Sequence, residues 1–79
     1  MHVQATSAGI DAFVKHGMSD KLKSADLCII ARTQEPTHIN DVIDSVREDR
    51  HWPGIKRAWI VSRVVKLEAY GYVRVLHEV

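Results

Sequence analysis

Cysteine, proline and glycine are scarce in this chain, and each scarcity excludes a class of protein. A single cysteine, Cys28, stands among 79 residues, so the chain can form neither an internal disulfide nor a paired-cysteine zinc site. Only four glycines and two prolines occur, while hydrophobic residues make up 46% of the chain and charged residues 27%. This composition is typical of a folded globular protein and excludes a disordered tail. The lone cysteine favours a reducing, cytoplasmic setting, where Cys28 is most simply a small core residue.

Long apolar runs are missing as well. The longest covers residues 27–31, far short of the roughly 18 residues that a membrane-spanning helix needs. The first residues, MHVQATSAG, have neither the charged nor the apolar region of a signal peptide. We therefore expect a cytoplasmic protein with no membrane partner. Internal repeats and linkers are also absent, so residues 1–79 are predicted to form a single domain.

Charge is nearly balanced in total but unevenly distributed along the chain. The net charge is +1 and the pI is about 8.0, below the value of about 9 that marks an evident nucleic-acid-binding domain. Acidic side chains outnumber basic ones between residues 37 and 50. Residues 55–67, in contrast, carry four basic side chains and no acid, namely Lys56, Arg57, Arg63 and Lys66. The chain therefore separates its charges by structural element.

Two segments in the first half of the chain have apolar residues at helical spacing. A short helix is predicted after the capping residue Thr6 or Ser7, and Gly17 is its expected end. A second helix is predicted over residues 20–33, because Leu22, Ala25, Ile29 and Ile30 form one stripe. The polar residues expected to face water from this second helix are Lys21, Lys23 and Asp26.

The second half of the chain predicts two more helices and a strand. Thr37 is the expected N-cap of a third helix, whose apolar stripe consists of Ile39, Val42, Ile43 and Val46. A fourth helix is predicted over residues 55–70, with Gly71 as a left-handed residue at its end. Residues 72–79 are expected to be a strand. This strand needs a partner, which either residues 1–5 or a second protomer must supply.

The end of the fourth helix carries the pattern LExxGxV, formed by Leu67, Glu68, Gly71 and Val73. Leu67 is expected to anchor the helix in the core, Gly71 to reverse the chain and Val73 to begin the strand. Following two other helices, this pattern resembles the winged helix-turn-helix DNA-binding domains of MarR-like regulators, over residues 22–75. The resemblance implies a mainly α fold with a small β element, a winged-helix-like domain of three to four helices with a C-terminal strand. Only one strand follows the last helix, so the wing is expected to be truncated or missing.

The exposed face expected for the fourth helix carries side chains that suit DNA. Arginine can fork onto guanine edges or phosphates, lysine can contact phosphates, and Ser62 can donate to a backbone oxygen. One short recognition helix offers few contacts, so we expect a homodimer on double-stranded DNA. Such a protein would regulate transcription by occupancy. The candidate DNA-binding residues are Lys56, Arg57, Trp59, Ser62, Arg63, Lys66 and Arg74.

The same helix supports an alternative, a protein-binding accessory module of the phage or plasmid type. Trp59 and Tyr70 would then be the anchors that dock on a partner protein, because tryptophan, tyrosine and arginine are the usual anchors of protein interfaces. The near-neutral net charge and the bulk of Trp59 favour this alternative. A basic helix face is also often no more than a solvated surface, and the tryptophans can simply cover a small core.

Catalytic and metal-binding signals are weak. The five histidines have no short pairing such as HxxxH, so we expect no metal site. Asp41, Asp44 and Glu48 share one helix face, but neither a nucleophile nor a glycine-rich phosphate loop accompanies them. We therefore expect no enzyme activity and no cofactor.

Overall fold

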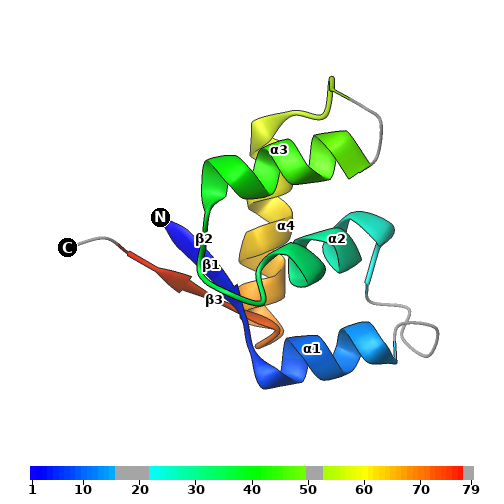
Figure 1. The fold of residues 1–79 in the computed structure, drawn as a ribbon, viewed down its shortest axis with the longest axis vertical. Helices are drawn as coiled ribbons and strands as arrows, with labels where there is room; N and C mark the ends of the chain where they lie inside the picture. Colours follow the sequence, from blue (N-terminus) through cyan, green and yellow to red (C-terminus); the bar gives the residue numbers. More distant parts are fainter. Residues whose placement is uncertain (16–21, 50–52, 78–79) are drawn as a thin grey trace.

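The computed structural model describes residues 1–15, 22–49 and 53–77, and these form helices packed beside a small sheet (Figure 1). The helices are α1 (Ser7–Val14), α2 (Ser24–Arg32), α3 (Ile39–Asp49) and α4 (Arg57–Ala69). The strands are β1 (His2–Ala5), β2 (Thr37–His38) and β3 (Val73–Leu76). The expected class, mainly α with a small β element and a C-terminal strand, is confirmed. The expected helix end at Gly17 and the position of Lys21 lie outside the described residues.

The N-terminal strand forms the middle of the sheet. The strand order is β2-β1-β3, and both pairings are antiparallel. His2 lies opposite His38 on one side and Leu76 on the other, while Ala5 lies opposite Val73. Of the two partners expected for the C-terminal strand, the structure therefore uses residues 1–5 of the same chain. This pairing joins the two ends of the sequence. Strand β1 also pairs with β2, a strand that the sequence did not indicate.

One apolar core lies between the sheet and the helices. Helices α3 and α4 contribute the stripes that their spacing predicts, α2 contributes Ala25, Ile29 and Ile30, and Val3, Ala5 and Val73 contribute from the sheet. Leu22, expected in the stripe of the second helix, is half-buried and lies before α2, which begins at Ser24. Helices α2 and α3 cross in front of α4, which runs behind them (Figure 1). No helix within residues 1–15, 22–49 and 53–77 is long and apolar enough to cross a membrane. The buried apolar side chains of the helices and their connections are Ala25, Ile29, Ile30, Ile39, Val42, Ile43, Val46, Ile55, Ile60, Val64 and Leu67.

The third helix begins at Ile39, one residue later than a cap at Thr37 would place its start. Thr37 belongs to β2, where its hydroxyl donates to the carbonyl oxygens of Arg32 and Glu35, at 3.2 and 2.9 Å. The expectation that Thr37 caps this helix is therefore wrong. The backbone amide of Asn40, in the first turn, donates instead to Nδ1 of His38 at 3.1 Å.

Helix α4 ends where the sequence predicts. Gly71 has a φ of +80°, in the left-handed region. Its amide donates to the carbonyl of Glu68, and the amide of Tyr72 donates to the carbonyl of Leu67, both at 2.9 Å. These two bonds form a Schellman motif, which satisfies the last carbonyls of the helix and turns the chain into β3.

Thr6 joins the start of α1 to the end of α4. Its hydroxyl oxygen accepts from the amide of Gly9 at 3.1 Å, which caps α1 as expected, and the same hydroxyl donates to the carbonyl of Gly71 at 2.6 Å. The amide of Thr6 donates to the carbonyl of Tyr72 at 2.9 Å. A Cβ atom on Gly9 would lie 2.0 Å from that same carbonyl oxygen, so only glycine allows this contact.

The close approach at Gly9 decides which face of α1 is buried. Gly9 is buried and Phe13 is half-buried, whereas Ile10 and Val14 are 39% and 71% exposed. Helical spacing groups Ile10, Phe13 and Val14, but the backbone contact at Gly9 turns α1 so that two of these three side chains meet solvent.

Substitution of Gly9 and of Gly71 should separate a steric effect on stability from an effect of backbone strain. We expect Gly9→Ala to lower the free energy of unfolding by at least about 1–3 kcal/mol, because the new methyl overlaps the Tyr72 carbonyl. Gly71→Ala should cost about 1–2 kcal/mol, since nothing lies within 4 Å and only the positive φ is strained. Urea unfolding measures both values. Gly71→Asn should recover part of its loss whereas Gly9→Asn should not, and equal recovery at both sites would contradict the assignment.

Candidate functional site on helix α4

The pitch of α4 decides which of its side chains are available for binding. Ile60, Val64 and Leu67 are buried as the sequence predicts. At about 100° per residue, the opposite side of the helix is centred on small side chains. This exposed α4 face consists of Ala58, Trp59, Ser62, Val65, Lys66, Ala69 and Tyr70.

Most of the sequence-predicted residues of α4 are exposed, but Arg63 is not. Lys56, Arg57, Ser62 and Lys66 are exposed, whereas Arg63 is only 6% exposed. The expectation that Arg63 lies on the DNA-facing surface is therefore wrong. Its position explains this, since it follows Ile60 by three residues and precedes Leu67 by four, which places it between two core residues on the same side of the helix.

Arg63 is held by a buried carboxylate on α2. Its Nε donates to Oδ1 of Asp26 at 2.8 Å, and its Nη2 donates to Oδ2 at 2.5 Å. Asp26 is completely buried, which contradicts the expectation that it faces water. Its Oδ2 also accepts from the backbone amide of Lys23 at 2.8 Å, so the same carboxylate caps α2. A bidentate pair with this extra hydrogen bond is the geometry in which a buried charge pair is tolerated.

The pair stabilises the charged form of Arg63. The hydrogen bond with the Asp26 carboxylate raises the pKa of the Arg63 guanidinium above its ordinary value, although burial acts in the opposite direction. A raised pKa in the folded state stabilises the protein at every pH below the unfolded pKa of arginine. That contribution is lost only as the pH rises through the folded value, so it is fully present at neutral pH.

The remaining candidate residues differ in how they are held. Nη1 of Arg57 donates to Oδ1 of Asn40 at 2.6 Å, which links the first turns of α3 and α4. The hydroxyl of Ser62 donates to the carbonyl of Trp59 at 2.6 Å. Lys56 is the N-cap residue of α4, and within residues 1–15, 22–49 and 53–77 no side chain makes a capping hydrogen bond at that end of the helix. Arg74 is exposed on β3, next to the buried Val73, so it projects from the sheet face turned away from the core.

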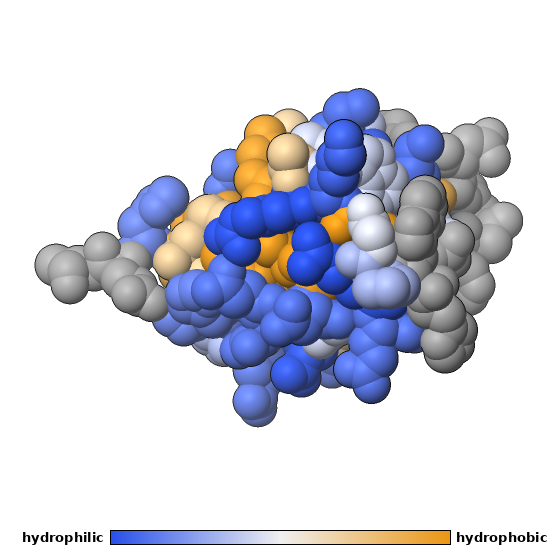
Figure 2. Space-filling view, turned by 90° about the horizontal axis from the view of Figure 1, so that it is seen from above, coloured by the Kyte–Doolittle hydropathy of each residue, from blue (hydrophilic) through white to orange (hydrophobic). Residues whose placement is uncertain are grey.

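Large apolar side chains are also exposed on this helix. Trp59 and Tyr70 are each 42% exposed, and Val65 is 57% exposed. The Tyr70 ring packs against that of Tyr72, with centroids 5.9 Å apart. From above, hydrophilic side chains cover most of the surface and apolar ones show through in its middle (Figure 2). On the exposed α4 face, the apolar contact area of Trp59, Val65 and Tyr70 lies on the same side of the helix as the cation Lys66.

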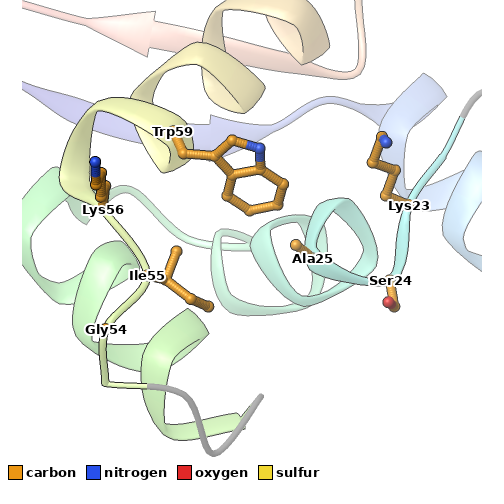
Figure 3. A pocket seen from close by; sticks show the side chains of 7 residues that line it. All are labelled: Lys23, Ser24, Ala25, Gly54, Ile55, Lys56 and Trp59. Carbon is orange, nitrogen blue, oxygen red and sulfur yellow. The ribbon is translucent and has the colours of Figure 1, made fainter.

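Sequence reasoning missed Lys23, which lies at the start of α2 near the start of α4. Lys23 and Lys56 are far apart along the chain, yet they line one cavity together with Trp59 (Figure 3). No periodicity signals this proximity, because it depends on how α2 packs against α4. Lys23 thereby adds a cation beside the N-terminal end of the exposed α4 face.

Comparison of this chain with protein-family models, with curated proteins and with solved structures found no match.

Asp26 and Arg63 should show a large coupling energy in a double-mutant cycle. Removal of one partner, as in Asp26→Leu or Arg63→Met, leaves an uncompensated buried charge and should cost about 3–5 kcal/mol in the free energy of unfolding. The double variant should be far more stable than the sum of the single losses predicts, since neither charge then remains. Urea unfolding of the four proteins gives the coupling energy, and additive losses would contradict a direct pair.

Proposed function

We propose that this protein is a small DNA-binding regulator that places the exposed α4 face on double-stranded DNA and acts by occupancy. The observation that carries this proposal is the arrangement of α4. Lys56, Arg57 and Lys66 are exposed around the small side chains of Ala58 and Ser62. Small residues allow a helix to approach the floor of a groove closely, while the cations at its edges reach phosphates.

The packing of α3 against α4 fits this proposal. In a helix-turn-helix unit the second helix enters the major groove while the first crosses the backbone. Here the hydrogen bond between Arg57 and Asn40 links the two helices, and Nε of Arg47 on α3 donates to the carbonyl of Ile55 at 2.8 Å. Both contacts hold the start of α4 at the surface. The resemblance to winged helix-turn-helix domains remains part of the proposal.

The sheet limits what the protein can use besides α4. The strand β3 pairs with β1, and within the described residues no further strand follows it to form a wing. In this proposal α4 and its immediate neighbours supply the contacts with DNA. One such helix gives few base contacts, and a homodimer on two half-sites would supply the rest.

A protein partner is a second candidate because of one specific observation. Val65 is 57% exposed close to the centre of the α4 face, with Trp59 on the same helix. A branched apolar side chain at that point gains nothing from phosphates, whereas protein interfaces have apolar centres with aromatic anchors.

Salt dependence tests the DNA proposal directly. With Lys56, Arg57 and Lys66 as phosphate contacts, the log-log slope of affinity against salt should be about −3 per protomer. Fluorescence anisotropy of a labelled mixed-sequence duplex, between about 50 and 200 mM salt, measures this slope. Lys66→Gln should make it shallower by about 1, while Lys15→Gln, the same charge change directly after α1, should leave it unchanged. Absence of binding at the lowest salt would refute the proposal.

Val65→Lys distinguishes the two candidates. An added cation in the middle of the α4 face should strengthen duplex binding and steepen the salt slope by about 1. A protein partner that buries Val65 would instead lose affinity, because the lysine brings a charge into an apolar contact. Anisotropy with the duplex measures the first effect. Weaker duplex binding by this variant, with its unfolding free energy unchanged, would count against DNA and for a protein partner.

A further inference from the structure

A cavity of about 530 Å³ opens between the first turn of α2 and the first turn of α4 (Figure 3). Its volume lies in the range of about 300–1,000 Å³ that small-molecule sites occupy. We call it the α2–α4 cavity. The described residues that line it are Lys23, Ser24, Ala25, Gly54, Ile55, Lys56 and Trp59.

The walls of the α2–α4 cavity are mainly apolar. Ala25 and Ile55 are buried and line one side, and the indole of Trp59 extends across the space towards α2 (Figure 3). Trp59 is nevertheless 42% exposed. The Trp59 ring is only half covered and lies above two aliphatic side chains. An apolar ligand that binds there would displace water from this apolar surface, which is favourable.

The charged side chains that line the cavity are both cationic. The side chains of Lys23 and Lys56 stand on opposite sides of the Trp59 ring (Figure 3). Among the described residues, no ion pair involves either lysine. The nearby Asp26 carboxylate is buried and already paired with Arg63, so it does not neutralise them.

The start of α4 adds to this positive field. Lys56 is its N-cap residue, no side chain of the described residues makes a capping hydrogen bond there, and its first turn contains no acid. The amides at a helix N-terminus carry partial positive charge and attract anions. The cavity therefore combines apolar walls with two lysines on its rim and a helix end without a side-chain cap. These features are complementary to a ligand with one negative group and an apolar body.

We propose that the α2–α4 cavity binds a small monoanion with an apolar body, of the aliphatic carboxylate class. The apolar chain lies against Ala25, Ile55 and the ring of Trp59. The carboxylate lies beside Lys56 at the start of α4, and Lys23, on the other side of the Trp59 ring, adds to the positive field of the cavity. This assignment goes beyond DNA binding and does not depend on it, although Lys56 contributes to both surfaces.

The test uses octanoate, with octanol and octylamine as probes of the same chain length. Titration without DNA, below micellar concentrations, is followed by the fluorescence of Trp59 in a Trp52→Phe background and by calorimetry. Octanoate should bind saturably and change Trp59 emission, octanol should bind more weakly, and octylamine should bind weakest. Equal binding of the three probes, or no saturable binding of octanoate, would overturn the proposal.

Matched lysine variants locate the carboxylate. Lys56→Gln should weaken octanoate binding by about fivefold, which corresponds to about 1 kcal/mol for a partly exposed charge contact, and Lys23→Gln should weaken it by a smaller factor. Neither should change octanol binding, and Lys66→Gln should change neither ligand. All three lysines are exposed, so these variants keep the core intact. If Lys66→Gln weakened octanoate binding as much as Lys56→Gln does, the lysines would act only through general charge attraction, and the assignment would be overturned. Because no DNA is present, the result is separate from that of the duplex experiment.

Discussion

The buried carboxylate of Asp26 holds together the parts of this protein from which its surface is built. It accepts two hydrogen bonds from Arg63 on α4 and one from the backbone at the start of α2. A charge pair out of water is tolerated only when both partners are present and well oriented, so α2 and α4 can pack in few other ways. This one arrangement fixes the rotation of α4 about its axis. The rotation in turn places small and apolar residues at the centre of the exposed face and brings Lys23 close to Lys56.

The sheet imposes a second constraint, which acts at the opposite end of α4. Gly71 turns the chain out of the helix, and Thr6 contacts the carbonyl of that turn while its own amide binds the next residue. The two ends of the chain therefore close on each other through β1 and β3. Helix α4 is held at its middle by an ion pair and at its C-terminal end by a backbone network. A helix held in this way presents a rigid surface, which a binding function needs.

These constraints change how the basic segment is interpreted. Four cations within residues 55–67 suggest a uniformly basic helix, but one of them, Arg63, stabilises the core instead. An alanine variant of Arg63 would reduce any binding activity by disturbing the fold, so it cannot report on a contact with DNA. The exposed face is correspondingly less basic and more apolar than the sequence indicates. Its mixed character is why both a nucleic acid and a protein are considered as partners, and why charge alone does not separate them.

The sequence by itself determined the local features of the protein, because these depend on neighbours along the chain. The stripes of Val42, Val46, Ile60 and Val64, the left-handed Gly71 and the strand that follows it were all predictable from spacing and from glycine chemistry. The buried state of Asp26 and Arg63 was not, although both occupy core-facing positions, since a charge is buried only when its partner arrives from another helix. The orientation of α1, the central place of β1 and the α2–α4 cavity likewise depend on contacts between residues far apart in the chain. Tertiary packing alone decided them, because only packing determines which surfaces meet.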